Sequence, residues 1–461
     1  MWDAFVSGLG RNLVFRSQKT KVIYLTLVLL AIAARLVSMG RYETQYWASD
    51  SWEAPSGTYR SYVPDRLVGA SIPLDPSVAA AVAKAEGDIR ALNAETRYLT
   101  DTEPLARIIM RSEAMASSRI EGLEVPAGRF LEYEALDELG VAHRPDTTEA
   151  AVVSNISAMR EGIEGLANGA VLDIDYLLGV NKALLDRTRM ATYGGVIRSE
   201  QNWIGGNDLN PVGAAYVPPR PQLVNACLGD LVEFCNTSDL PSLAVAAIAH
   251  AQLETIHPFA DGNGRTGRAL VHALLKMRGL TPLVVPPISL VLATDKRRYI
   301  DQLVAYRVDA EEEGGRTFVE AANGWVRYFA IAASLSCKRA AQFEESLARI
   351  QEEWRTRLRP RAKSAADILL RKLPGNPVVS VASAARLTGR SREASRLAIA
   401  SLVESGILVQ SSKNRKSGLY SAREVLDAFT LYERSLSVPG GDTTLEKPVR
   451  PVPQRPVPRR L

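Results

Sequence analysis

The chain has 461 residues, of which 46% are hydrophobic, 7% are aromatic and 23% are charged, and its formal net charge is +5. This length allows roughly three domains with cores of their own, and the Ala- and Leu-rich stretches between polar turns favour a mainly α fold. So small a net charge does not by itself indicate a nucleic-acid-binding protein, and three cysteines at no metal-ligand spacing argue against a disulfide framework and favour a cytoplasmic location.

An apolar run lies near the N-terminus, at residues 22–34. Extended to Met39, it approaches the roughly 18 residues of a membrane span, but it then includes Arg35, and no clean signal-peptide cleavage site follows. We therefore treat residues 1–40 as an extension with three interpretations: a membrane anchor, a buried or interfacial helix, or sequence upstream of a true start at Met39. Membrane association is expected only if the run 22–39 belongs to the native protein.

Residues 41–150 are predicted to form an N-terminal helical region. A polar, turn-rich stretch comes first, and a helical period of apolar residues begins at Asp75. A second helix, with the sequence TEPLARIIMRSEAMASS, is expected to end near Gly122, which is followed by Pro126.

Residues 151–335 are predicted to form a second helical domain. Its helices are interrupted between residues 193 and 221 by a stretch with Gly and Pro, whose alternating, β-branched segments predict a short β-hairpin. Two further helices, at 242–255 and 265–277, are joined by a tight loop of Gly, Asn and Asp residues. This helix–loop–helix is the chemical centre of the sequence.

The C-terminal part is predicted to contain a connecting helix at 336–363 and a small unit at 364–436. The pattern of this unit predicts a short helix, a Gly turn, a second helix and two strands, which is the outline of a winged helix-turn-helix. The tail at 437–461 is Pro-rich, basic and without apolar periodicity, and we expect it to be disordered.

The loop between the two helices gathers groups suited to phosphoryl chemistry. It contains a proton acceptor, a carboxylate, an amide between two glycines and two guanidiniums, namely His257, Asp261, Gly262, Asn263, Gly264, Arg265 and Arg268. Glycine lets the backbone approach a ligand closely, and the N-terminus of the second helix adds a partial positive charge. The loop is therefore expected to stabilise a polyphosphate.

Each charged residue of the loop offers a chemical role. Arg265 and Arg268 lie on one helical face and can hold phosphate oxygens in a two-pronged geometry, and Asp261 offers a hard oxygen ligand to Mg²⁺. His257 can accept the proton of an incoming hydroxyl.

The segment from His257 to Arg268 resembles the signature of Fic (filamentation induced by cAMP) proteins, His-x-Phe-x-Asp/Glu-Gly-Asn-Gly-Arg-x-x-Arg, at every specified position. The resemblance implies a Fic-type helical bundle that transfers AMP from ATP to a hydroxyl of a protein target, itself included, and releases pyrophosphate. It also implies that His257 is the general base, that Asp261 holds Mg²⁺, and that the residues around Asn263 bind phosphates together with Arg265 and Arg268.

Gly264 favours AMP transfer over the activities of other Fic relatives. Kinase-like Doc relatives carry Lys at this position, and phosphocholine-transferring relatives bind their nucleotide differently. Transfer of UMP or GMP stays open, because the loop contacts phosphates while the base is recognised elsewhere.

The preceding stretch extends the resemblance, which covers residues 72–335. The segments QNWIGG and AYVPP are similar to the region that forms a hairpin flap over the site in Fic proteins. The resemblance implies that Gly205, Gly206, Tyr216 and Val217 bind an extended target segment by pairing with it as an added strand.

Ser117, Glu121 and Gly122 resemble the inhibitory motif of Fic proteins, Ser/Thr-x-x-x-Glu-Gly/Asn. Ser117 and Glu121 share a helical face and Gly122 ends the helix, so the carboxylate lies near the negative end of the helix dipole unless a cation compensates it. Arg268 is the expected cation. A guanidinium held by Glu121 cannot receive the outer phosphates of ATP, so we expect the enzyme to be autoinhibited.

A DNA-binding regulator, with the Fic site as a switch, is the alternative from a different class. Arg390, Arg392 and Arg396 lie near the second helix of the winged unit, where they could contact phosphates or bases. A homodimer is left open. The remaining histidines make no metal-ligand spacing and are expected to be structural: His143, His250 and His272.

Overall fold

The computed structural model describes residues 40–49, 56–94, 103–141, 147–166, 171–309, 316–410 and 418–435. The predicted N-terminal extension up to residue 39, His143 and the predicted tail from residue 437 lie outside these ranges. No helix within these ranges is both long enough and apolar enough to cross a membrane.

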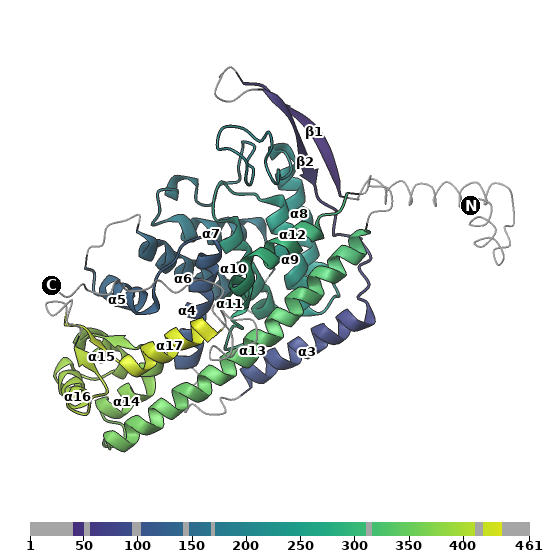
Figure 1. The fold of residues 1–461 in the computed structure, drawn as a ribbon. Coiled ribbons are helices and arrows are strands. Elements are labelled where there is room, and N and C mark those ends of the chain that lie inside the picture. Colours follow the sequence, from purple (N-terminus) through teal and green to yellow (C-terminus); the bar gives the residue numbers. More distant parts are fainter. Residues whose placement is uncertain are drawn as a thin grey trace, which may run out of the picture.

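The described chain is mainly helical, as predicted, with two small antiparallel sheets (Figure 1). The main body contains β1 (Arg41–Trp47), β2 (Gly57–Val63), α3 (Pro76–Asn93), α4 (Glu103–Ile120), α5 (Ala127–Asp137), α6 (Thr148–Gly165), α7 (Ile174–Leu185), α8 (Pro221–Thr237), α9 (Ser242–Ile256), α10 (Asn263–Met277), α11 (Ile288–Leu292) and α12 (Lys296–Tyr306). The long α13 (Phe318–Arg357) leads to α14 (Ala365–Lys372), β3 (Val378–Val379), α15 (Val381–Thr388), α16 (Arg392–Glu404), β4 (Val409–Gln410), β5 (Tyr420–Ser421) and α17 (Arg423–Ser435).

Helix α9 lies at the centre of the main body because it is apolar on nearly every side. Every residue from Leu243 to Ile256 is buried, which is the pattern of a helix surrounded by other elements. Helices α8, α10 and α13 pack against it, and the indole Nε1 of Trp325 in α13 donates a hydrogen bond of 2.6 Å to the carbonyl of Ala247. The end of α9 is therefore a rigid support for the loop that follows.

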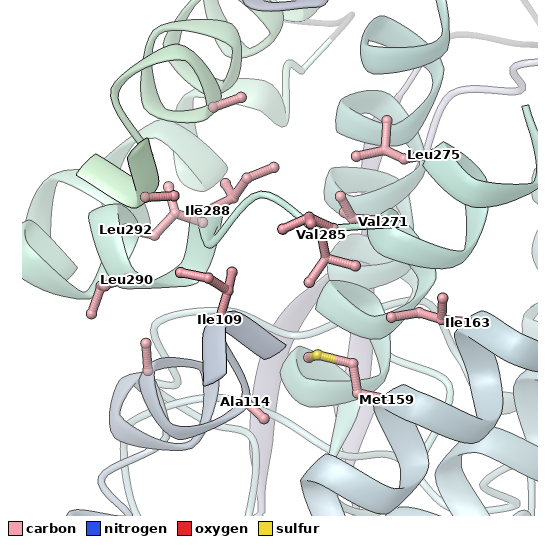
Figure 2. Close-up of a cluster of buried hydrophobic side chains, with 14 of the residues drawn as sticks. Ile109, Ala114, Met159, Ile163, Val271, Leu275, Val285, Ile288, Leu290 and Leu292 are labelled. Atoms are coloured by element: carbon pink, nitrogen blue, oxygen red, sulfur yellow. The ribbon is translucent and has the colours of Figure 1, made fainter. Parts of the chain in front are cut away.

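A hydrophobic cluster fixes α4 against α10. Glu121 directly follows the last residue of α4, and Arg268 lies in α10. Figure 2 shows side chains from α4, α6, α10 and α11 meeting there, Ile109, Met159 and Val271 among them. These side chains are almost fully buried, and burial of each contributes about 1.5–3 kcal/mol to folding. The relative position of α4 and α10 is thus set by core packing.

Helix α13 is a single helix of 40 residues that begins with a capping box between Thr317 and Glu320. It continues past the main body to the C-terminal unit (Figure 1), where the ring of Phe343 stacks on Tyr432 of α17 with centroids 4.4 Å apart. The boundary predicted at residue 336 lies inside this helix, because the surrounding Ala-rich sequence contains nothing that breaks a helix.

The C-terminal unit contains a three-stranded antiparallel sheet of order β3-β5-β4. Helices α15 and α16 pack against each other, and the turn between them contains Gly389 with a φ of +64°, a conformation that favours glycine. The order of elements follows the predicted outline, and the assignment as a winged helix-turn-helix stays a prediction.

The hairpin of β1 and β2 differs from the sequence expectation of a polar, turn-rich stretch at its position. Seven residue pairs join the strands, from Arg41 with Val63 to Trp47 with Gly57. Their alternating aromatic and polar residues suit a half-buried sheet, but the Pro and Gly residues around them are typical of turns. The hairpin is held by tertiary contacts, including an edge-on contact of Trp47 with Trp203 at 5.9 Å.

The C-terminal unit approaches α4 so closely at Gly375 that a larger residue does not fit. A Cβ atom there would lie 2.5 Å from the Cα atom and 2.7 Å from the carbonyl oxygen of Pro104. The backbone of Pro104 cannot move away from the added methyl group as a flexible side chain could. We therefore expect Gly375→Ala to lower the free energy of unfolding, measured by urea denaturation, by about 1–3 kcal/mol. Gly229→Ala in α8 is the control, since nothing lies within 4 Å of its added methyl group; equal stabilities would contradict the prediction.

Candidate active site

The loop from His257 to Gly262 is held in shape by its own polar groups. His257 takes a left-handed conformation, with φ 49° and ψ 59°, at the end of α9. The backbone N–H of Phe259 donates to Oδ1 of Asn263 (2.8 Å), and Nδ2 of Asn263 donates to the carbonyl of Phe259 (2.9 Å). The side chain of Asn263 is thus bonded to the loop, leaving its backbone N–H at the start of α10 as the group that can face an anion.

Gly262 is required by the local geometry of the loop. Its φ of +80° is unfavourable for other residues, and a Cβ atom would lie 2.7 Å from Cδ2 of Leu184 in α7. Helix α10 begins directly after it, so the positive end of this helix and its free N–H groups face the same side as the loop. This geometry suits an anion, and the binding of phosphates at this position stays a prediction.

His257 is largely enclosed, with 18% of its side chain exposed. Burial, and next the positive charge of Arg307, lower its pKa to about 4. Its carbonyl accepts a hydrogen bond of 2.9 Å from Nε of Arg198, and its Nδ1 lies 4.0 Å from Oε2 of Glu254. At neutral pH the imidazole is uncharged and can accept a proton.

We expect the imidazole of His257 to titrate near pH 4 in NMR spectra of the folded protein, against about 6.5 for a free histidine. Because the pKa is lowered in the folded protein, the unfolded chain takes up the proton first as the pH falls below about 6.5. Between about pH 6.5 and pH 4 this group therefore lowers the free energy of unfolding progressively, and below about pH 4 its effect no longer grows. Loss of the signal in His257→Gln identifies it. A midpoint at pH 6 or above would contradict the prediction.

Asp261 and Arg265 lie side by side at the mouth of the loop. The Asp261 side chain is 46% exposed, and its Oδ2 lies 3.2 Å from Nη2 of Arg265, whose own side chain is 5% exposed. Within the described residues, Nε and Nη1 of Arg265 are buried without a hydrogen-bond partner, and such groups are costly unless an anion satisfies them. A phosphate group fits this position.

The residues present fit Mg²⁺ as the phosphate-bound ion of such a site. Mg²⁺ usually takes one or two carboxylates and completes its shell with phosphate oxygens and water. Asp261 offers a half-exposed carboxylate beside the phosphate position, whereas no group of three or more His, Cys, Asp or Glu side chains suited to a metal occurs in the described part of the chain. Asp261 is the residue that would hold the ion.

Arg268 is almost fully buried and is held by the end of α4. Its Nη2 donates to Oε1 of Glu121 (2.7 Å) and to the carbonyl of Ser117 (2.9 Å), and its Nε donates to Oγ of Ser117 (2.8 Å). Gly122 follows with a φ of +86° and ends the helix. The structure thus brings together Ser117, Glu121 and Arg268, which sequence reasoning paired, across 147 residues.

The electrostatics of this pair follow from its surroundings. Burial favours the neutral form of Glu121, but the charge of Arg268 lowers the pKa of the carboxyl below its ordinary value. The pKa of Arg268 is raised by Glu121 despite burial. A Cβ atom at Gly264 would lie 2.2 Å from Oε1 of Glu121, so this glycine leaves the space that the carboxylate occupies.

The stretch predicted as a hairpin flap is mostly irregular. A single bridge joins Ile204 and Tyr216, and Gly205 and Gly206 follow it, both exposed and with φ of +73° and +79°. Tyr216 and Val217 are buried. Two strands of a hairpin therefore do not form in this stretch, because its Gly, Asn and Pro residues favour turns.

Tyr216 and Val217 are bonded to the rest of the protein. The hydroxyl of Tyr216 donates to the carbonyl of Thr255 (2.6 Å), and the guanidinium of Arg307 lies 3.5 Å from its ring centre. The backbone N–H of Tyr62 in β2 donates to the carbonyl of Val217 (2.9 Å). These contacts hold the stretch in place. Of the four residues predicted to contact a target, Gly205 and Gly206 are the exposed ones.

Sequence reasoning missed several polar residues of the site. Arg198 and Arg307 surround the loop, as described above, and Glu254 and Tyr299 lie beside Arg268. Nη1 of Arg268 is 3.9 Å from Oε1 of Glu254 and donates to the hydroxyl of Tyr299 at 3.5 Å. A signal for Glu254 was available, since it is the only Asp, Glu, Lys or Arg in α9.

The two other described histidines lie in the core. Nε2 of His250 is 2.8 Å from the hydroxyl of Tyr299, and burial, and next the charge of Arg268, lower the pKa of His250 to about 3. Nε2 of His272 is 2.7 Å from Oε1 of Glu113. Both side chains bridge neighbouring elements of the main body.

Two of the three arginines expected near the second helix of the C-terminal unit, Arg390 and Arg396, have partners within the protein. Nη2 of Arg396 lies 2.6 Å from Oε1 of Glu393, and Nη2 of Arg390 donates to the carbonyl of Lys363 (2.9 Å). These contacts do not favour an arginine surface reserved for phosphates.

Comparison with family models finds two adjoining regions. Residues 171–275 match the model of the Fic/DOC family, and residues 79–164 match the model of the N-terminal region of the Fic/DOC family. Together the two regions contain α3 to α10, apart from the first residues of α3, the last residue of α6 and the last residues of α10.

Curated relatives are similar over shorter stretches. The chain is 31% identical over 118 residues to "Protein adenylyltransferase fic-1" of Caenorhabditis briggsae, covering 25% of this chain and 21% of the relative. It is 25% identical over 223 residues to "Protein adenylyltransferase Fic" of Nematostella vectensis, covering 43% of this chain and 51% of the relative. The chain thus spans about a fifth to a half of the length of these relatives.

Among solved structures, a Fic family protein from Desulfovibrio desulfuricans G20 is similar with a TM-score of 0.47 and 20% sequence identity, covering 76% of this chain and 97% of that chain.

Proposed function

Because this chain contains a Fic domain preceded by a Fic/DOC N-terminal region, we propose that it is a protein adenylyltransferase, which transfers AMP from ATP to a hydroxyl group of a protein. The observation that carries the proposal is the loop at the start of α10. There an uncharged, enclosed His257 adjoins an anion position with two unpaired buried donors of Arg265. This is the combination that in-line attack on a phosphate requires.

The proposed reaction begins at His257. Its imidazole accepts the proton of the target hydroxyl while the hydroxyl oxygen attacks the α-phosphorus of ATP. The bond between the α-phosphorus and the oxygen that bridges to the β-phosphorus breaks, and pyrophosphate leaves. The N–H groups at the start of α10 and the guanidiniums of Arg265 and Arg268 stabilise the charge that develops on the phosphate oxygens. Mg²⁺, when bound at Asp261, neutralises part of that charge.

ATP is the proposed source of the transferred group. The curated relatives reported above carry the name protein adenylyltransferase, and position 264 is Gly, where kinase-like members carry Lys. Gly264 leaves room beside Arg268, since a Cβ atom would lie 2.9 Å from Nη1 of this residue. The proposed targets are hydroxyl-bearing residues of other proteins or of this chain itself.

Glu121 is proposed to restrain the reaction. It forms an ion pair with Arg268 at 2.7 Å, and this guanidinium is one of the two proposed to bind the outer phosphates. As long as the pair is formed, ATP binds weakly or with its α-phosphate out of line for attack. Ser117, which accepts two further hydrogen bonds from Arg268, supports the same arrangement.

Isotopic labelling of ATP tests the proposed function. A Glu121→Gly protein incubated with ATP and Mg²⁺ should incorporate label from the α-phosphate and none from the γ-phosphate, with one pyrophosphate released per AMP. Unlabelled ATP should compete better than CTP, GTP or UTP. Incorporation of γ-label would indicate a kinase, and preferential competition by UTP or GTP would indicate transfer of another nucleotide.

A further inference from the structure

Arg268 lies between two carboxylates of different exposure. Glu121 approaches from the end of α4 at 2.7 Å with 38% of its side chain exposed. Glu254 approaches from the last turn of α9 at 3.9 Å with 10% of its side chain exposed. The first carboxylate has room to turn toward solvent, whereas the second is enclosed by the core.

The second carboxylate also lies beside the proposed base. Glu254 and His257 are three residues apart at the end of α9, and Oε2 of Glu254 lies 4.0 Å from Nδ1 of His257. Its other oxygen, Oε1, faces Arg268. A single buried side chain thus stands between the residue proposed to take the proton and one of those proposed to hold the phosphates.

The environment of Glu254 depends on Glu121. Burial raises the pKa of the Glu254 carboxyl to about 7, Arg268 opposes this rise, and the negative charge of Glu121 adds to it. Two carboxylates that share one guanidinium cannot both be fully compensated. If Glu121 leaves, its repulsion disappears and Glu254 becomes the negative group that remains beside Arg268.

Arg268 needs such a partner, because its side chain is 2% exposed and an uncompensated buried charge is strongly unfavourable. The alternative outcome, in which the guanidinium turns away to find another acceptor, would remove it from the phosphate position. The neighbouring Tyr299 hydroxyl, 3.5 Å from Nη1, is neutral and cannot replace a carboxylate.

We propose that Glu254 is a positioning residue, which holds Arg268 in its phosphate-binding place after Glu121 has left. The proposal rests on the proposed function, since it assigns Glu254 a part in the same site. Replacing Glu254 with Asp keeps the charge, and replacing it with Gln removes the charge. Comparing the two variants distinguishes loss of the charge from collapse of the site.

The test compares three substitutions in a Glu121→Gly background. Glu254→Gln keeps the shape and removes the charge, and it should raise the KM for ATP about tenfold, the effect of losing an opposite charge 3.9 Å from the guanidinium. Glu254→Asp keeps the charge but moves it farther from Arg268, and its KM should rise about threefold to fivefold, between those of the parent and the Gln form. Glu86→Gln is the matched control, because Glu86 is a buried carboxylate that accepts a hydrogen bond from Leu243 at the other end of α9.

The outcomes separate this proposal from the proposed function. No incorporation by Glu121→Gly itself refutes the function, whatever Glu254 does. An active parent whose KM for ATP is equally raised by Gln and Asp, or by neither, refutes the role of the charge, as does an equal rise with Glu86→Gln. If the Gln form does not fold, the Asp form decides: a KM for ATP within about twofold of the parent overturns the proposal.

Discussion

Replacing His257 with Ala in a Glu121→Gly protein is expected to reduce AMP incorporation by about a hundredfold to ten-thousandfold, the usual contribution of a general base. Without the imidazole, the target hydroxyl must lose its proton to water, which reaches this position poorly because the side chain of residue 257 is only 18% exposed. The proposed base is uncharged above roughly pH 5, since its pKa lies at about 4, so the loss should be equally large at pH 7 and pH 8. Initial rates with ATP labelled at the α-phosphate measure it.

Nucleotide binding provides the control for this substitution. His257 is not among the residues proposed to hold the phosphates, so ATP affinity in calorimetry should change by less than about threefold. A substitution that abolishes ATP binding would act through folding of the loop and not through proton transfer. Incorporation that stays within tenfold of the parent would show that another group removes the proton.

The loop could be predicted from the sequence because its chemistry is continuous in the chain. His257 to Arg268 span the end of one helix, a turn and the first turn of the next, and local geometry alone sets their spacing. Even so, the sequence did not show that the side chain of Asn263 would bond to Phe259. That bond depends on the detailed path of the turn.

The contact between Glu121 and Arg268 is a long-range one that the sequence also indicated. Its distance of 2.7 Å agrees with the pairing inferred from the end of a helix at Gly122 and from the resemblance to an inhibitory motif. The role of this contact in restraint stays a prediction. Local signals located the carboxylate, but only the packing of α4 on α10, seen in Figure 2, brings it to its partner.

Glu254 and the hairpin of β1 and β2 show where sequence reasoning failed. An acidic residue in an apolar helix is a signal of burial beside a cation, yet its partner, Arg268, lies on the following helix and had been assigned to Glu121 alone. The strands 41–47 and 57–63 are short, and their pairing depends on contacts with the stretch around Trp203 and Val217. Such tertiary contacts override local propensity.

Glu121→Gly is expected to raise self-modification with labelled ATP by about tenfold to hundredfold, which corresponds to the roughly 1.5–3 kcal/mol of a hydrogen bond between charged groups. The substitution removes the carboxylate 2.7 Å from Nη2 of Arg268 and frees the guanidinium for phosphate. Ser117→Ala removes only the acceptor of Nε and should raise the rate by less. Glu121→Asp keeps a charge that no longer reaches Arg268, so it should behave like the Gly form. If both Glu121 variants incorporate label at the rate of the unsubstituted protein, the ion pair holds α4 in place without restraining the reaction.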